Sequence, residues 1–456
     1  MQGLGYVGAA MAIATANARD DNGAACFDVI GVERDDARGS ARALALQTGR
    51  FPYATADTAL EAAAADAHAY GNLSATTDPA AYELASVAVC DVHLDVIEDA
   101  DGVRADTSVL EGAVRTLGER LPAGALVIVE TTVPPGTCER LVAPILAAAC
   151  RERGLAADAI ALAHSYERVM PGPDYLRSIT NFWRVYAGRD DAAAAACAAF
   201  LGRVVNVQDY PLRRLASMTA SETAKVLENS YRAANIAFID EWGRLAEAYG
   251  IDLFEVLDAV RDRPTHDNIR QPGFGVGGYC LTKDPLLPLA SVRAFLPDVP
   301  LSFPFAELAV HINRAMPQAN LARITALLDG SLVGRRLLLL GVAYRGEVDD
   351  TRYSPAEAFY RAAIAAGASV RCHDPLVRHW EELGIDIDPE LPSAGTVDAV
   401  VLAVPHMAYR ALDVVAWLGA AKPLVYDCDN VLSGAMRQAL RAHGCRVEST
   451  GRGSGL

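Results

Sequence analysis

A cysteine that follows a run of glycines is the residue of this sequence best suited to covalent chemistry. The segment Gly273–Asp284 contains four glycines, then Cys280, and then Lys283 and Asp284. Glycines leave the backbone open to a ligand, a thiolate nucleophile needs access and nearby positive charge, and a carboxylate within reach can activate water. We expect Cys280 to act as a nucleophile and the other eight cysteines to pack in the core.

A second glycine pattern stands at the start of the sequence. Gly3, Gly5 and Gly8 have the spacing G-x-G-x-x-G, and the residues after them are typical of a helix. In a dinucleotide-binding turn, such glycines let a pyrophosphate approach the helix N-terminus. Glu33 closes the next predicted strand, where a carboxylate accepts hydrogen bonds from ribose hydroxyls and repels a 2′-phosphate. The pattern favours NAD over NADP; the alternative is a glycine turn without a ligand.

Only Met1 and Gln2 precede this turn. The strand that feeds such a turn normally lies at the centre of a doubly wound sheet. We therefore expect the native chain to start upstream of Met1, which the mass of the protein from its native source would test.

Four polar residues share one face of a predicted helix. Glu222, Lys225, Asn229 and Arg232 are separated by three, four and three residues, which is the spacing of neighbours on a helix surface. One interpretation is a solvated face with a Glu–Lys pair. The other is a stripe that lines a wet cleft, where a lysine stabilises an alkoxide and an amide completes an oxyanion site.

Short apolar runs alternate with helical stretches at both ends of the chain, which predicts parallel sheets covered on both faces. Eight strands are expected: Phe27–Glu33, Ser86–Val92, Ala125–Glu130, Ala159–His164, Leu337–Gly341, Ser369–His373, Ala399–Val404 and Leu424–Asp427. The expected helices include Leu110–Leu121, Thr137–Arg153, Leu212–Leu253, Leu253–Val260, Phe305–Leu328, Pro355–Ala366 and Gly434–Ala442. Thr450–Leu456 is expected to be a loose tail. The fold class is α/β, with two Rossmann-like domains joined by a long central helix and the boundaries 1–210, 211–328 and 329–456.

Composition restricts the class of protein. The 456 residues include 41 Lys and Arg against 57 Asp and Glu, a net charge of −16. This balance disfavours nucleic acid and anionic membranes as partners, although a few cations can still hold one phosphorylated ligand. No apolar run is long enough to span a bilayer and no signal peptide is recognisable. Nine cysteines without a Cys-x-x-Cys pair make a disulfide framework or a structural metal site improbable. A cytoplasmic protein without a metal is expected.

The motifs together resemble those of the nucleotide-sugar 6-dehydrogenases, the family of UDP-glucose and UDP-N-acetylhexosamine dehydrogenases. The resemblance extends along nearly the whole chain. Its motifs are Gly3–Gly8, Glu130–Thr137 (ETTVPPGT), the helix Glu222–Glu241, Gly273–Asp284, and Leu340–Arg345 with Asp350–Pro355.

The resemblance implies a four-electron oxidation of the sugar C6 alcohol to a carboxylate, with two NAD consumed. Cys280 would form a thiohemiacetal and then a thioester, Asp284 would assist water, Lys225 and Asn229 would stabilise the oxyanion, and Thr132 would place water or cofactor. Glu167 would line the sugar site and join the proton relay. The expected cofactor contacts are Gly3, Gly5, Tyr6, Val7, Gly8, Glu33, Thr132, Lys283 and Arg352. The expected nucleotide-sugar contacts are Glu167, Arg168, Lys225, Asn229, Arg270, Gly277 and Arg345.

The substrate is expected to be a UDP-N-acetylhexosamine, because the sequence SYERVMPG around Glu167 and the run Gly-Val-Gly-Gly before Cys280 resemble that branch. Lys283-Asp284 is instead typical of the UDP-glucose branch. Three residues depart from the family pattern: His93 follows a strand end that is usually rich in proline, Arg345 replaces a lysine, and Asp429 replaces an arginine near the nucleotide phosphates.

Two alternatives remain: a UDP-glucose dehydrogenase, and a two-electron hydroxyacid-type dehydrogenase that uses the helix lysine and no thiol. A regulator that has lost catalysis is a third class, disfavoured by the intact Cys280–Asp284 segment. We expect a homodimer or a higher homo-oligomer, because the long helix carries Ile236, Phe238, Ile239 and Trp242, more apolar surface than one chain needs to bury.

Overall fold

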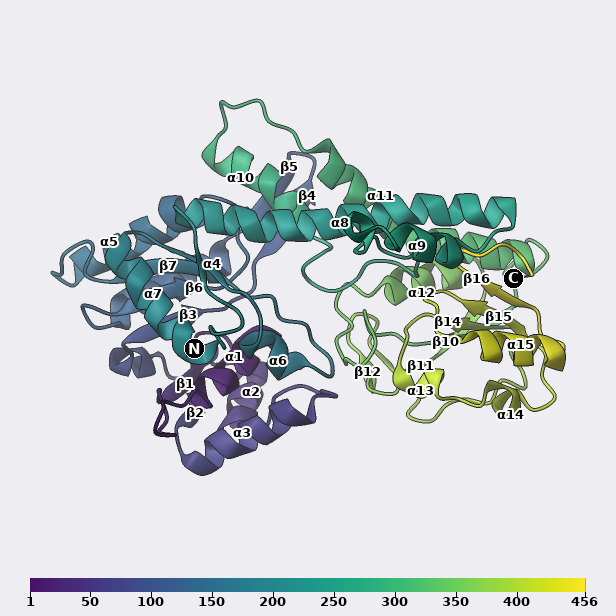
Figure 1. Ribbon diagram of the computed structural model, residues 1–456, viewed down its shortest axis with the longest axis horizontal. Helices are drawn as coiled ribbons and strands as arrows, with labels where there is room; N and C mark the ends of the chain where they lie inside the picture. The colour runs from purple at the N-terminus through teal and green to yellow at the C-terminus, as the bar shows by residue number, and fades with distance from the viewer. Residues whose placement is uncertain (456) are drawn as a thin grey trace. The chain divides into compact units, whose positions relative to one another are not determined.

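The computed structural model describes residues 1–455 and divides them into two compact units. Unit 1 comprises Met1–Glu228 and Leu286–Phe303, and unit 2 comprises Asn229–Pro285 and Pro304–Leu456. Both units have α/β architecture with mainly parallel sheets (Figure 1), which confirms the predicted fold class. The boundary between the units falls inside the long helix α8 (Met218–Tyr249). The three predicted domain boundaries stay a prediction.

Unit 1 contains a doubly wound sheet. Its strands are β1 (Val29–Val32), β2 (Leu73–Thr76), β3 (Val87–Cys90), β6 (Leu126–Val129), β7 (Ala161–Tyr166), β8 (Val185–Gly188) and β9 (Arg213–Arg214). Gln2 pairs in parallel with both Val32 and Cys90, so it joins the pair β2-β1 to the row β3-β6-β7-β8-β9. Met1–Gln2 therefore occupy the central strand position before the glycine turn. One pairing, β7 with β8, is antiparallel, so the sheet is not purely parallel.

Strand β6 shows how both faces of this sheet are buried. Leu126 and Ile128 join the core cluster that contains α1 (Tyr6–Ala16) and α3 (Thr58–Tyr70). Val127 and Val129 join the cluster of α4 (Ser108–Arg120) and α5 (Ala143–Glu152) on the opposite face, because successive side chains of a strand point to opposite sides. The remaining elements of unit 1 are α2 (Ala37–Gln47), η1 (Pro79–Leu84), β4 (Asp95–Asp99), β5 (Gly102–Asp106), η2 (Cys138–Val142), α6 (Tyr175–Thr180), α7 (Asp191–Val204) and α10 (Leu287–Phe295).

Unit 2 contains a parallel sheet of order β11-β10-β14-β15-β16. Its strands are β10 (Arg336–Leu340), β11 (Ser369–His373), β14 (Ala399–Leu402), β15 (Leu424–Asp427) and β16 (Val447–Ser449). The same alternation holds here: Leu339 and Val401 pack with α12 (Pro355–Ala365), and Leu338 and Val400 pack with α15 (Gly434–His443). The remaining elements are α9 (Leu253–Arg261), η3 (Pro264–His266), η4 (Asp284–Leu286), α11 (Pro304–Leu327), β12 (His379–Trp380), β13 (Ile385–Asp386), α13 (Met407–Arg410) and α14 (Val414–Leu418).

Two sequence predictions about segments are wrong. Helix α8 begins at Met218 rather than at Leu212, because Arg213 pairs with Val185 as part of β9. The segment after Ser449 is not loose: Thr450 donates a 2.5 Å hydrogen bond to Asn320, and the guanidinium of Arg452 binds Asp252 at 2.7 Å. Leu456, the last residue of the predicted tail, lies outside the described residues.

Candidate active site

The glycine turn of unit 1 gives each of its glycines a different physical role. A Cβ on Gly3, where φ is +87°, would lie 2.2 Å from the carbonyl oxygen of Asp91, and one on Gly8 would lie 2.1 Å from that of Gly3. A Cβ on Gly5 would meet nothing within 4 Å. Gly3 and Gly8 therefore serve close packing, whereas Gly5, the N-cap of α1, borders open space at the positive end of a helix. This arrangement fits the approach of a pyrophosphate.

Glu33 lies against this turn. Its carboxylate accepts a 2.9 Å hydrogen bond from the Leu4 N–H and a 3.3 Å contact from the Arg42 guanidinium. The ring of Tyr53 stacks on Tyr6 at 3.9 Å between centroids and covers the turn. Residues positioned in this way fit a dinucleotide whose ribose binds an acidic side chain. The contribution of Tyr53 was not predicted, and its distance in sequence from the glycines gives no signal for it.

Asp91 is a second residue that sequence reasoning missed. Its carboxyl approaches Gly8 of the glycine turn. Burial, and then the neighbouring carboxylates of Glu130 and Glu167, raise the pKa of Asp91 well above its usual value, although Arg184 acts in the opposite direction. The raised pKa favours the neutral form of the Asp91 carboxyl, which repels a diphosphate less than an ionised carboxylate would. Its place directly after a buried strand was the available signal.

The loop between β6 and η2 is fastened to the start of α8. Glu222 is almost fully buried and accepts hydrogen bonds from the N–H groups of Gly136 at 2.5 Å and Cys138 at 2.7 Å. Burial raises the pKa of Glu222 to about 7, against the lowering effect of these hydrogen bonds. The loop so held carries Thr132, which is half-buried.

Lys225 lies one turn further along α8 and is buried. Its ammonium donates to the carbonyl oxygen of Glu167 at 2.8 Å and contacts the Glu167 carboxylate at 3.2 Å. Arg168 forms an ion pair with Glu228 of the same helix. Glu222, Lys225 and Asn229 are all buried, so the solvated interpretation of this helix face is wrong for these three residues. Arg232, the fourth, keeps solvent access, although its guanidinium is partly desolvated.

Cys280 belongs to unit 2 and differs from every other cysteine. It is exposed, whereas Cys26 is partly buried and the remaining seven are buried. The pKa of Arg232 is lowered by desolvation and then by Arg270, with Arg345 adding to the decrease, and a favourable interaction with Cys280 opposes it. The thiol therefore lies within electrostatic reach of a guanidinium, which is the setting that favours a thiolate.

Asp284 lies one helical turn after Cys280 and is fully buried. Its N–H donates to the Cys280 carbonyl oxygen at 2.9 Å, and its carboxylate receives the Asn229 amide at 2.7 Å and the Lys283 ammonium at 2.7 Å. Lys283 also lies 4.5 Å from the centre of the Tyr279 ring. A buried carboxylate with two such donors is held in one position beside the chain of the nucleophile.

The glycines before Cys280 are needed for a different reason from the one predicted. A Cβ on Gly275 or Gly277 would come within 2.7 Å of Pro355, and one on Gly278 would lie 2.7 Å from the Tyr344 ring. The loop thus packs tightly against the segment after β10 instead of leaving open space for a ligand. That segment contains Arg352, whose guanidinium lies 5.5 Å from the Tyr279 ring and pairs with Asp350. Arg270 and Arg345 are exposed.

Comparison with known proteins places the chain in a family. Profiles of three domains of the UDP-glucose/GDP-mannose dehydrogenase family match: the NAD binding domain over residues 1–203, the central domain over 219–315 and the UDP binding domain over 338–434. The chain is 32% identical over 311 residues to a UDP-N-acetyl-D-mannosamine dehydrogenase of Pyrococcus horikoshii, which covers 68% of this chain and 69% of the relative. The chain belongs to the UDP-glucose/GDP-mannose dehydrogenase family. The resemblance inferred from the motifs is thereby confirmed.

Two solved structures are similar over almost their whole length. A UDP-D-ManNAc dehydrogenase from Pyrococcus horikoshii superposes with a TM-score of 0.80 at 27% identity, covering 99% of this chain and 98% of the other. A UDP-glucose dehydrogenase from Pyrobaculum islandicum superposes with a TM-score of 0.81 at 25% identity, covering 99% and 97%.

Membership of this family makes the protein an oxidoreductase that uses NAD, and the glycine turn with Glu33 has the residues that this cofactor needs. The predictions of NAD and of an NAD-dependent dehydrogenase are confirmed. The individual catalytic and binding residues stay predictions. Among residues 1–455, no helix is both long and apolar enough to cross a membrane.

Proposed function

We propose that the protein oxidises the C6 alcohol of a nucleotide sugar, a UDP-N-acetylhexosamine, to a carboxylate through a covalent bond to Cys280. One observation carries the proposal: of nine cysteines, the one in the motif segment is exposed and interacts with a guanidinium. A thiol in this setting retains a half-oxidised substrate, so that a second oxidation can follow the first.

The proposed chemistry balances over two oxidations. NAD, which the glycine turn and Glu33 would hold, would supply the hydride acceptor for each oxidation. The alcohol first loses a hydride and a proton and becomes an aldehyde. The Cys280 thiolate then adds to the aldehyde carbon, and the carbonyl oxygen takes up a proton to give a thiohemiacetal. Loss of the second hydride and of the hydroxyl proton gives a thioester. Water finally adds to this carbon, the C–S bond breaks, and the carboxylate and the thiolate are released.

We assign the remaining roles by motif and by local geometry. Asp284, fixed one turn after Cys280, assists the water. Lys225 and Asn229 supply positive charge and a donor to the oxyanion at C6. Glu167, held against Lys225, lines the sugar site and shares in proton transfer. The assignments of Thr132 to water or cofactor, of Lys283 and Arg352 to the cofactor, and of Arg168, Arg270, Gly277 and Arg345 to the nucleotide sugar rest on the motifs.

The N-acetylhexosamine is favoured over glucose by the motif around Glu167 and by the UDP-N-acetyl-D-mannosamine dehydrogenases among the relatives. Asp429 stands where an arginine was expected. Burial and the charge of Asp427 raise the pKa of Asp429 to about 8, so its carboxyl is largely neutral at pH 7 and adds little repulsion of a nucleotide phosphate.

We also infer that the protein forms a dimer or a larger homo-oligomer. Helix α8 leaves Phe238, Trp242 and Leu245 about half exposed, and Phe305 of α11 is 85% exposed. Ile239 is buried in the chain's own core, so the prediction that it faces a partner is wrong. Sedimentation at micromolar concentration tests the proposal, which predicts that Trp242→Glu shifts the assembly toward monomer. A wild-type monomer would contradict it.

A cytoplasmic location is inferred from the cysteines. All nine are free, which suits a reducing compartment.

The decisive experiment counts NADH formed per molecule of sugar nucleotide. A panel of UDP-N-acetylmannosamine, UDP-N-acetylglucosamine, UDP-N-acetylgalactosamine and UDP-glucose is oxidised to completion, and absorbance of the reduced cofactor is read. We expect two NADH per substrate, with an N-acetylhexosamine preferred. Preference for UDP-glucose would identify that alternative, and one NADH per substrate would indicate a two-electron dehydrogenase.

A matched pair of variants tests the thiol. Cys280→Ser should abolish turnover, whereas Cys26→Ser, which changes a partly buried cysteine outside the motif, should leave it unaltered. Steady turnover by Cys280→Ser would refute the covalent mechanism.

A further inference from the structure

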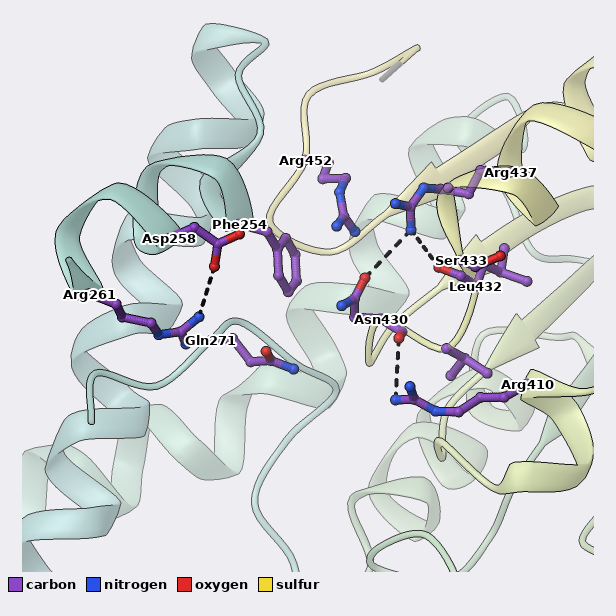
Figure 2. Close-up of a pocket in the computed structure, with 12 residues that line it drawn as sticks. Phe254, Asp258, Arg261, Gln271, Arg410, Asn430, Leu432, Ser433, Arg437 and Arg452 are labelled. Atoms are coloured by element: carbon purple, nitrogen blue, oxygen red, sulfur yellow. Dashed lines mark hydrogen bonds and ion pairs between the residues drawn. The ribbon is translucent and has the colours of Figure 1, made fainter. Parts of the chain in front are cut away.

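A cleft of unit 2 has a concentration of positive charge that is unusual for this acidic chain. It has a volume of about 390 Å³ and lies among α9, the end of α13, the loop after β15 and the start of α15 (Figure 2). Its charged lining consists of Arg261, Arg410, Arg437 and Arg452 against Asp258 alone. Arg261 pairs with Asp258 at 3.3 Å and Arg452 with Asp252 at 2.7 Å, which leaves two lining guanidiniums, those of Arg410 and Arg437, in excess within a chain of net charge −16.

Arg452 is the most informative of these residues because it is only 4% exposed. Its Nε binds Asp252 at 2.7 Å, and its guanidinium lies 3.9 Å from the centre of the Phe254 ring. Its Nη1 is buried and has no hydrogen-bond partner among residues 1–455. Figure 2 shows this guanidinium directed into the space between Phe254 and Arg437. A buried cationic donor without an acceptor is costly to the fold, so an acceptor supplied by a ligand accounts for it.

Arg437 faces Arg452 across the cleft. It donates to the carbonyl oxygen of Leu432 at 2.7 Å and to the side chain of Asn430 at 3.5 Å. Desolvation, followed by repulsion from Arg452, lowers the pKa of Arg437. The carboxylate of the nearby Asp427 is engaged by the N–H groups of the loop after β15. Two guanidiniums that repel each other are stabilised by an anion between them.

Helix α15 adds its N-terminus to the same cleft. Ser433, its N-cap, and Gly434, its first residue, both line the cleft. The Ser433 hydroxyl accepts from the N–H of Met436, while the positive end of a ten-residue helix faces the cleft. The N-terminus of α15 and the two arginines come from different segments of the chain, and all of them favour a negatively charged ligand.

We propose that this cleft binds a phosphate group carried by a small organic molecule, with Arg437 and Arg452 as its principal contacts. A phosphate is the anion whose oxygens suit two guanidinium groups and a helix N-terminus together. The volume lies in the range of small-molecule sites, and Phe254 and Leu432 supply apolar contacts beside the charges. The inference does not depend on Cys280, and none of these arginines belongs to the residues assigned above to catalysis.

Calorimetric titration of the full chain with inorganic pyrophosphate tests the site. We expect saturable binding that weakens by about tenfold or more in Arg437→Gln and in Arg452→Gln. Arg361→Gln is the matched control, because Arg361 is an exposed arginine of unit 2 outside the cleft. It should bind as the wild type does. Thermal melting of each variant verifies folding. Equal affinities in wild type and Arg437→Gln, or no binding at roughly 10 mM, would overturn the proposal.

A second titration distinguishes the two sources of the phosphate. If the cleft receives the diphosphate of the nucleotide sugar, saturating UDP abolishes pyrophosphate binding, and Arg437→Gln raises the KM for the sugar nucleotide without changing kcat. This outcome would tie the site to the proposed function. If the ligand is a separate phosphorylated metabolite, pyrophosphate still binds the UDP-saturated protein and the KM is unchanged. The calorimetric readout needs no turnover, so failure of the proposed oxidation leaves it interpretable.

Discussion

The buried carboxyl of Glu222 makes the stability of unit 1 depend on pH in a defined direction. Burial raises its pKa from 4.5 to about 7. A shift of one pKa unit corresponds to about 1.4 kcal/mol, so a shift of this size corresponds to about 3 kcal/mol. Below pH 4.5 the carboxyl is protonated in both the folded and the unfolded state. Between pH 4.5 and about 7 the unfolded state has released its proton while the folded state still holds it, so the free energy of unfolding falls across this range and levels off above pH 7.

The Glu222→Gln variant lacks the titration. We expect the free energy of unfolding of the wild type, relative to that of Glu222→Gln, to fall by about 3 kcal/mol between pH 4 and pH 8. Urea denaturation followed by tryptophan fluorescence at several pH values measures this double difference, in which any constant effect of the amide cancels. Glu119→Gln, which removes an exposed carboxylate of α4 that is not among the groups shifting the pKa of Glu222, controls for the loss of one charge. Parallel pH curves for wild type and Glu222→Gln would refute the reasoning.

Three further predictions concern unit 1. Arg184 and Glu130 form a fully buried pair at 2.6 Å, so Arg184→Met should lower the free energy of unfolding by about 3–5 kcal/mol because it leaves a buried carboxylate without its partner. The double variant Arg184→Met/Glu130→Leu should regain part of this loss. Urea denaturation measures both variants, and a double variant as unstable as Arg184→Met would contradict the prediction. Gly5→Ala should fold normally but bind NAD at least about tenfold more weakly, whereas Gly8→Ala should be unstable; fluorescence titration and thermal melting separate the two. The KM of the wild type for NAD should rise with pH as Asp91 ionises, and Asp91→Asn should lack this increase; a wild-type KM that is independent of pH would contradict this.

Local patterns predicted the elements better than their contacts. The strands at Ser369–His373 and Leu424–Asp427 end where expected, because continuous apolar runs between turn residues mark buried parallel strands. The tail after Ser449 was wrongly expected to be loose, because its order comes from Asn320, Glu247 and Asp252, which lie far away in the sequence. Tertiary hydrogen bonds of this kind leave no periodic signal.

In the candidate site, too, the sequence predicted the important residues better than their contacts. The chemical type of Cys280 and the spacing of the glycines were sufficient to identify both motif segments. Spacing alone left two interpretations of the α8 face, and only burial separates them: Glu222 and Lys225 contact the loops of unit 1 and not water. The reason for the glycines before Cys280 also needed coordinates, since Pro355 and Tyr344 fill the space that a side chain would need.

Two buried carboxyls lie beside the places proposed for phosphorylated ligands in this acidic chain. Asp91 lies beside the glycine turn of unit 1, and Asp429 lies beside Gly273 of unit 2. Burial is the largest cause of the raised pKa of both, and a neighbouring carboxylate, Glu130 or Asp427, adds to it. The raised pKa of each carboxyl favours its neutral form, which repels an anion less than the ionised form and can donate a hydrogen bond. The formal net charge of −16 counts both carboxyls as ionised. Each should repel an anionic ligand more strongly when the pH rises above its pKa.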